Sequence, residues 1–391
     1  MKFKSKGKKR IVRRIIAIIV LPLLCLAAVF ANSFIPQDLA DVYCSKVFPI
    51  ISIPLQSINM YFQHSMTENA VVCLGPLLVV GIIVWIVVLI KRALSHGALE
   101  YLYRSFRNVL VLVLIGAVLF QAMHGINYKR THVVDELDLT DEELTYEDYC
   151  VALEWAYAGL IEARSQLGED YNGVAHMTDS FENSASYANS LLNAFCLEYD
   201  IPLSENYVRA KPVSMSHYWS YTYIVGMYDP FLAEVNVNTD YEDITGFPLT
   251  VCHELCHAKG YASETDCNTL AALACCFSER ADFRYAGFYE VFWSLYGVAR
   301  VSAKKLEKEL PPYLETDAMI PVFRDAQAES LYWEQIDYEV DEIKKKLGID
   351  ITEVSTATND AFLKTNGETG VESYVVPDST YVRFYLTYVG G

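Results

Sequence analysis

Apolar residues are concentrated in three runs within the first 125 residues of the chain. These runs cover about 15–34, 70–90 and 108–124. A helix of about 20 apolar residues can cross a bilayer, so the pattern predicts three transmembrane helices. Two alternatives stay open: the first run could be a signal peptide, because Val29-Phe30-Ala31 resembles a cleavage site. The third run is short enough to be a buried core helix instead.

After residue 125 the pattern changes to the shorter periods of a globular domain. Apolar residues repeat with helical spacing over 141–167 and 180–199. Residues 231–238 alternate in their second half and predict a strand. Further helices are predicted at about 264–280, 285–309, 326–347 and 350–365. The expected fold class is therefore α+β, a mostly helical domain with a small sheet, preceded by three transmembrane helices.

Basic residues are distributed unequally around the apolar runs. Residues 1–14 hold eight Lys or Arg, the loop at 32–70 holds one, and the loop after the second run holds four. Because Lys and Arg are enriched in cytoplasmic loops, we expect a basic cytoplasmic tail over 1–14 and a membrane region over 15–125. Residues 126–391 would then form an extracytoplasmic domain of a multi-pass cell-membrane protein. Within the first loop, a short membrane-surface helix is expected near residues 50–62.

Composition narrows the class of protein further. The 391 residues are 52% hydrophobic with a mean hydropathy of +0.17, which favours membrane spans and one sizeable domain. Residues 126–391 carry 18 basic and 45 acidic residues, a net charge of −27, and such a surface is no nucleic-acid binder. The expected partners are a lipid bilayer and a peptide or protein. Most of the ten cysteines are expected as buried thiols, and a disulfide involving Cys44, Cys150 or Cys196 stays open.

The segment His253-Glu254-Leu255-Cys256-His257 is an HExxH motif. Residues four apart lie on one face of a helix, so His253 and His257 can both direct a ring nitrogen at one tetrahedral Zn²⁺. Glu254 lies on the same turn and would take a proton from a water whose pKa the zinc lowers. The motif therefore predicts a catalytic zinc site. The alternative is two histidines on a core helix without a metal.

A catalytic zinc site needs a third protein ligand, and the next expected helix offers two acidic candidates. Glu264 lies in its first turn, close to His257, and is the preferred ligand. Asp266 is the alternative ligand, and its other expected role is a capping box with Ser263. Asn268 is expected to orient Glu264 through a hydrogen bond. A metzincin is disfavoured because Ser263 stands where that class needs a third His.

The HExxH motif stands among several other short motifs. They are Pro230-Phe231, Glu234-Val235-Asn236-Val237-Asn238, Gly260-Tyr261-Ala262, Glu264-x-x-Cys267-Asn268, His124-Gly125-Ile126-Asn127-Tyr128, and Asn359-Asp360 with Lys364-x-Asn366-Gly367. Together they resemble an uncharacterised bacterial family of membrane-anchored, zincin-like metallopeptidases. The chain departs from the family pattern at Cys267, where Ala is usual, and at Asp266, where Glu is usual.

The resemblance implies a zincin-like catalytic domain in which the strand before the motif helix forms the rim of the cleft. An extended substrate could add to that rim by backbone pairing. Glu234, Asn236 and Asn238 are then expected to line the cleft, and the alternative is that they lie on a solvated strand face.

Peptide hydrolysis also needs a group that stabilises the oxyanion, usually a Tyr, His or Arg beside the zinc. The candidates are His176, His217, Tyr218, Tyr285 and Tyr374, of which Tyr374 lies in a family-like block. We therefore expect a membrane-anchored zinc metallopeptidase. Two alternatives are a zinc-containing membrane sensor or scaffold with little turnover, and a cell-wall amidase that uses the same site.

Overall fold

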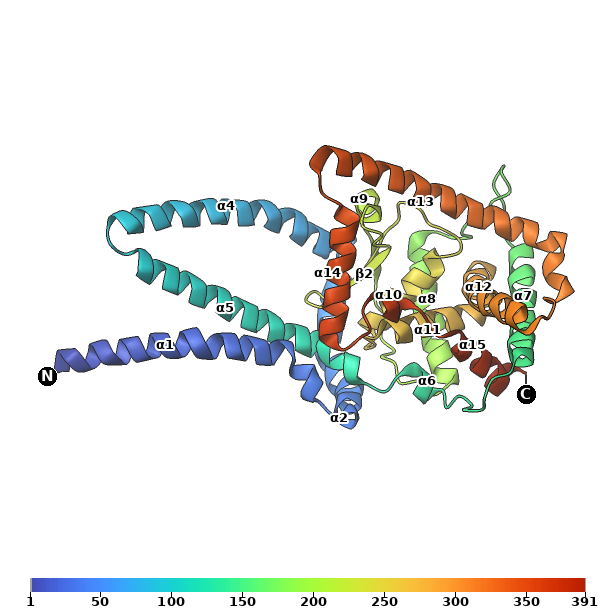
Figure 1. Ribbon diagram of the computed structural model, residues 1–391, viewed down its shortest axis with the longest axis horizontal. Coiled ribbons are helices and arrows are strands. Elements are labelled where there is room, and N and C mark those ends of the chain that lie inside the picture. The colour runs from blue at the N-terminus through green and yellow to red at the C-terminus, as the bar shows by residue number, and fades with distance from the viewer. Residues whose placement is uncertain (1, 391) are drawn as a thin grey trace.

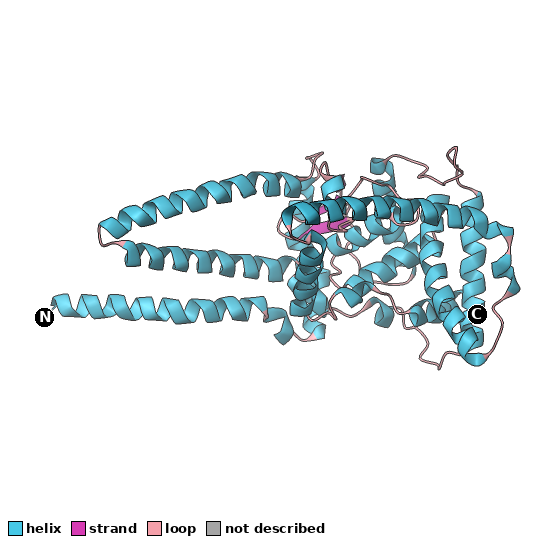
Figure 2. Ribbon diagram, turned by 45° about the horizontal axis from the view of Figure 1, so that its top comes forward, coloured by secondary structure: helices cyan, strands magenta, loops and turns pink. Residues whose placement is uncertain are grey.

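The computed structural model describes residues 2–390, which form a globular part and long helices that project from it (Figure 1). The projecting helices are α1 (Lys2–Val29), α4 (Met66–Leu94) and α5 (Ala98–Met123). Figure 2 shows that all three leave the globular part in the same direction. The turn between α4 and α5 lies at the same end of the molecule as the N-terminus (Figure 1).

Two of these helices, α4 and α5, are long and apolar enough to cross a membrane. Their most apolar windows have mean hydropathies of 3.0 and 2.0 and are 0% and 11% buried by protein, so α5 is not a core helix. The prediction of a third span at 15–34 is wrong. The apolar part of α1 is Ala17–Val29. A helix of this length covers only about 20 Å of a hydrocarbon core that is about 30 Å thick.

A chain segment between α1 and α4 folds against the junction of the projecting helices and the globular part. It contains the 3₁₀ helix η1 (Ala31–Phe34), α2 (Gln37–Val42), the short π-helix η2 (Tyr43–Val47) and α3 (Phe48–Asn59). The expected membrane-surface helix near residues 50–62 corresponds to α3. A second 3₁₀ helix, η3 (Gly125–Lys129), leads from α5 into the globular part.

The globular part is mostly helical, as predicted. Its helices are α6 (Val133–Glu136), α7 (Tyr146–Ser165), α8 (Phe181–Glu198), α9 (Ser216–Ser220), α10 (Phe247–Ala258), α11 (Glu264–Cys276), α12 (Ala281–Leu306), α13 (Ile320–Leu347), α14 (Ile351–Asn366) and α15 (Asp378–Phe384). The helices predicted from apolar spacing correspond to α7, α8 and α11 to α14. All ten cysteines are free thiols.

The sheet has three short strands in the order β1-β3-β2. β1 (Ala210–Pro212) pairs in parallel with β3 (Glu234–Val237), and β2 (Gly226–Asp229) pairs antiparallel with β3. The strand predicted at 231–238 is thus confirmed as β3. It lies in the centre of the sheet, with partners on both sides.

Helix α10 lies in the centre of the globular core. It contacts α8, α11 and α12, and the strands β2 and β3. Ten of its twelve residues are buried, because small Cys and Ala side chains let neighbouring helices approach on several sides. The HExxH motif is therefore held by packing on nearly every face.

Candidate metal centre

A tight turn brings the start of α11 back beside the end of α10. Gly260 has φ +109°, a backbone conformation that L side chains rarely adopt. The Tyr261 amide then donates to the Cys256 carbonyl at 3.1 Å, and Nη1 of Arg130 donates to the Gly260 carbonyl at 2.9 Å. This turn points Glu264, the first residue of α11, at the histidines of α10.

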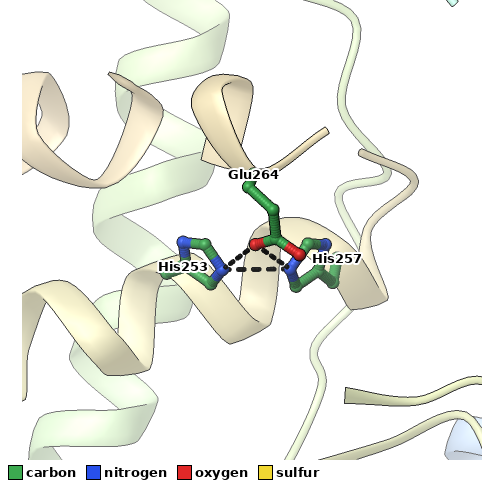
Figure 3. A group of neighbouring side chains, drawn as sticks. All are labelled: His253, His257 and Glu264. Carbon is green, nitrogen blue, oxygen red and sulfur yellow. Dashed lines mark hydrogen bonds and ion pairs between the residues drawn. The ribbon is translucent and has the colours of Figure 1, made fainter. Parts of the chain in front are cut away.

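His253, His257 and Glu264 form one cluster of three side chains (Figure 3). The Nε2 atoms of the two histidines are 3.0 Å apart. Oε2 of Glu264 lies 3.0 Å from Nε2 of His253 and 3.4 Å from Nε2 of His257. All three residues are more than nine-tenths buried. The preferred ligand set predicted from the motif is therefore brought together at one point.

The hydrogen bonds of both rings fix which nitrogen carries the proton. Nδ1 of His253 lies 2.6 Å from Oδ1 of Asn268, whose Nδ2 donates to the Tyr374 carbonyl. Nδ1 of His257 lies 3.0 Å from the Tyr261 carbonyl oxygen. Both Nδ1 atoms face acceptors and so carry the hydrogen of the neutral rings, which leaves each neutral ring with a free lone pair on Nε2. Two lone pairs and a carboxylate oxygen thus meet at 3.0–3.4 Å, an arrangement that a cation stabilises.

The pKa shifts in the cluster also indicate that it attracts a cation. Burial alone would raise the pKa of Glu264, but the neighbouring His257 and His253 lower it below its ordinary value. Burial opposes protonation of His257, yet the carboxylate of Glu264 raises its pKa to about 9. The cluster therefore attracts positive charge, whether a proton or a metal ion.

The donor set fits Zn²⁺. Nitrogen and oxygen ligands at about 2.05 Å on a tetrahedron are about 3.3 Å from one another, close to the separations of 3.0–3.4 Å in the cluster. Two imidazoles and one carboxylate also match the ligand types of catalytic zinc sites, which keep a fourth position for water or substrate.

Glu254 lies beside the cluster without belonging to it. It is 6% exposed, and its Oε2 has no hydrogen-bond partner within residues 2–390. Burial raises its pKa, against the opposing effect of His253 and His257. A Cβ on Gly226 of β2 would come within 2.5 Å of Oε1 of Glu254, so the missing side chain at Gly226 makes room for this carboxylate.

The alternative ligand Asp266 points elsewhere. Its carboxylate accepts hydrogen bonds from the Val133 amide at 2.9 Å and from Nδ1 of His132 at 3.0 Å, and so caps α6. Ser263 makes no side-chain cap to α11, so the expected capping box does not form. Asn268 does support the cluster, but through His253 and not through Glu264 as expected.

The residues predicted to line the cleft from β3 are buried structural residues. Glu234 forms an ion pair with Lys211 and accepts hydrogen bonds from the Met66 and Thr67 amides at the start of α4. Asn236 bonds within the sheet, and Asn238 donates to Ser220 and Ile224. The prediction of a cleft rim on this strand is wrong, because β3 is paired on both sides and β2 is the strand beside Glu254.

Among the candidates for oxyanion stabilisation, Tyr374 is the one beside the cluster. Its ring is stacked on His253 with a centroid distance of 6.3 Å, and its hydroxyl accepts from Nδ2 of Asn359 at 3.4 Å. Burial and then the charge of Glu264 raise its pKa. Tyr285 donates to buried Asp325, and His217 lies between Asp240 and Glu339. His176 packs against Gly168, and Tyr218 is exposed.

Three aromatic residues near the cluster had no predicted role. The ring of His124, at the end of α5, lies 5.5 Å from the ring of His257 and 5.2 Å from that of Tyr128. The ring of Tyr228 on β2 is stacked on His257 at 6.4 Å. Burial lowers the pKa of His124 to about 3, so this ring is neutral. In the sequence, the only indication that His124 and Tyr128 lie near the site was their position in a motif that resembles the family.

The amino-acid match to a known family covers the whole of this arrangement. Residues 43–376 match the model described as protein of unknown function, DUF3810. The chain belongs to the DUF3810 family. No curated protein and no solved structure matches it. The DUF3810 match includes α4, α5 and the three clustered side chains, but its description carries no activity, so the zincin-like assignment stays a prediction.

Proposed function

We propose that this DUF3810 protein is a membrane-anchored zinc metallopeptidase in which His253, His257 and Glu264 hold Zn²⁺. One observation carries the proposal: the Nε2 lone pairs of both histidines and Oε2 of Glu264 converge at 3.0–3.4 Å. Like charges and lone pairs at such distances repel one another unless a cation lies among them. A bound Zn²⁺ would act as a Lewis acid on a water and on the scissile carbonyl.

Glu254 is the general base in this proposal. Its Oε2 is buried next to the cluster and has no hydrogen-bond partner in the described part of the chain. It accepts a proton from the attacking water as the new C–O bond forms. It then passes this proton to the amine nitrogen as the C–N bond breaks.

Tyr374 is the proposed stabiliser of the oxyanion. Its phenol is a neutral hydrogen-bond donor, and stacking on His253 keeps the ring beside the cluster. A donor fixed before the reaction strengthens as charge develops on the carbonyl oxygen.

The proposed location of the active site is extracytoplasmic. The turn between α4 and α5 lies at one end of the molecule, far from the globular part (Figure 1). Lys91, Arg92, Arg104 and Arg107 flank that turn. Basic loops stay in the cytoplasm, which supports a globular part on the other side of the cell membrane.

The test uses the full chain purified in detergent. We expect about one bound zinc per chain by elemental analysis, and cleavage of a peptide library by mass spectrometry. Glu254→Gln should keep the zinc and abolish cleavage. A wild-type chain without metal, or full activity in Glu254→Gln, would refute the proposal. Bound zinc with digestion of muropeptides alone would indicate an amidase, and bound zinc without any cleavage would indicate a sensor or scaffold.

A further inference from the structure

The segment 31–62, from η1 to just beyond α3, exposes many apolar side chains. Phe34 is 81% exposed, Ile50 is 73% exposed and Tyr61 is 84% exposed, and Leu39, Val42 and Ile58 are also more than half exposed. Over residues 31–62 the charged residues are Asp38, Asp41 and Lys46. An apolar surface of this extent marks an interaction site, since water does not solvate it well.

This apolar segment is continuous with the C-terminal end of α5. Nδ2 of Asn32 donates to the Gly125 carbonyl at 3.1 Å, and the Tyr43 hydroxyl donates to the Ala122 carbonyl at 2.5 Å. Nε2 of Gln121 donates to the Val29 carbonyl at 2.8 Å. The apolar surface of the segment therefore begins where that of α5, a candidate membrane span, ends.

The segment also contacts the turn between α10 and α11, which positions the cluster of His253, His257 and Glu264. Nε2 of Gln56 on α3 donates to the Ala258 carbonyl at 2.7 Å, at the end of α10. Phe48 packs against Gly260, where an added Cβ would lie 3.4 Å from its ring. The end of α5 also lies close to the cluster, because His124 directly follows this helix and the centroid of its ring lies 5.5 Å from that of the His257 ring.

We propose that the segment 31–62 lies in the surface of the bilayer and holds the His253–His257–Glu264 cluster at that surface. The substrates would then be peptide segments that lie against the membrane, such as the segment next to a transmembrane helix or to a lipid anchor. The bilayer contact rests on the exposed apolar surface and its continuity with α5, whereas the substrate class rests on the proposed peptidase function. Lipid is favoured over a protein partner because the surface carries little charge and continues that of α5.

The bilayer contact is tested by photo-crosslinking in proteoliposomes made with the purified full chain. A benzophenone amino acid is introduced at Ile50 and at Ile58, with Val301 on α12 as the control. Val301 is 65% exposed and belongs to α12, a helix in the part of the globular region away from the projecting helices (Figure 1). We expect lipid adducts by mass spectrometry at the first two positions and not at the control. Crosslinked dimers, or no lipid adducts at Ile50 and Ile58, would overturn the contact.

The substrate class is tested with one peptide library anchored to vesicles in two ways. In one form a spacer of about three residues, about 10 Å long, follows the lipid anchor. In the other a flexible spacer of about 40 residues, with a root mean square length of about 35 Å, follows it. We expect at least tenfold faster cleavage with the short spacer. Equal rates of cleavage would overturn the proposed substrate class but would still support the peptidase function. Lipid adducts without cleavage of either form would refute the proposed peptidase function and support the bilayer contact.

Discussion

Oδ1 of Asn268 lies 2.6 Å from Nδ1 of His253, and this single contact sets the tautomer of the first proposed zinc ligand. The side chain cannot easily turn over, because its Nδ2 donates to the Tyr374 carbonyl at 2.6 Å. Asn268 stands one helical turn after Glu264, so α11 supplies both a proposed ligand and the group that orients another proposed ligand. Partners of this kind raise the basicity of a metal-binding histidine.

Removing this contact should weaken metal binding. Asn268→Ala leaves Nδ1 of His253 without its acceptor, and we expect a loss of about 10–100-fold in zinc affinity. Asn268→Asp keeps an acceptor at the same place and should restore most of the affinity. Competition with a chromophoric chelator measures both. Equal affinities for the wild type and Asn268→Ala would contradict the tautomer assignment.

The two acidic residues of α11 should have opposite effects when their charge is removed. Glu264→Gln should lose most of its zinc, because its carboxylate oxygen is within 3.4 Å of both histidines. Asp266→Asn should keep the zinc and instead destabilise the fold by about 0.5–2 kcal/mol through the weakened cap of α6. Elemental analysis and thermal unfolding separate the two. The reverse pattern would make Asp266 the third ligand.

The core of the site could be predicted because it is encoded locally. The spacing of His253 and His257 places both on one face of a helix, whatever surrounds it. Glu264 follows after one short turn, which leaves α11 few directions to take. The helices α7 and α8 were predictable for a similar reason, since apolar residues repeat with the helical period.

What could not be predicted depends on contacts between distant parts of the chain. The sequence of β3 alone is compatible with a strand at the rim of a cleft. Only its parallel pairing with β1 places it in the centre of the sheet. Asp266 looks like a local cap, but its partners Val133 and His132 lie about 130 residues earlier. Glu234 likewise serves the start of α4. Local patterns carry no information on such pairings.

Adding one methyl group at Gly226 should displace the proposed base. The Cβ of Gly226→Ala would lie 2.5 Å from Oε1 and 2.6 Å from Cγ of Glu254, too close without a shift of that side chain. A shift of about 1 Å can cost about 10²-fold in kcat, while zinc binding should persist. Gly297→Ala on α12, where a Cβ meets nothing within 4 Å, is the matched control. Kinetics on a cleavable peptide would show the loss, and unchanged kcat in Gly226→Ala would argue against Glu254 as base.

Glu329 should make the stability of the globular part depend on pH. Burial, followed by the charge of Asp243, raises its pKa to about 7, with Glu290 adding to the rise and a hydrogen bond from Thr245 opposing it. The folded state thus prefers the protonated acid. As pH rises from about 4.5, the ordinary value, to about 7, the unfolded state ionises first and the free energy of unfolding falls.

Glu329→Gln removes this effect, because the amide stays neutral at every pH. We expect no difference from the wild type at pH 4, and a higher unfolding temperature for the variant above about pH 7.5, by about 2–4 °C for each kcal/mol gained. Glu334→Gln removes a charge from an exposed position on the same helix and controls for net charge. Thermal unfolding of the three proteins across this pH range is the measurement. A gain at pH 4 as large as at pH 8 would show that the stabilisation is not the avoided ionisation of Glu329.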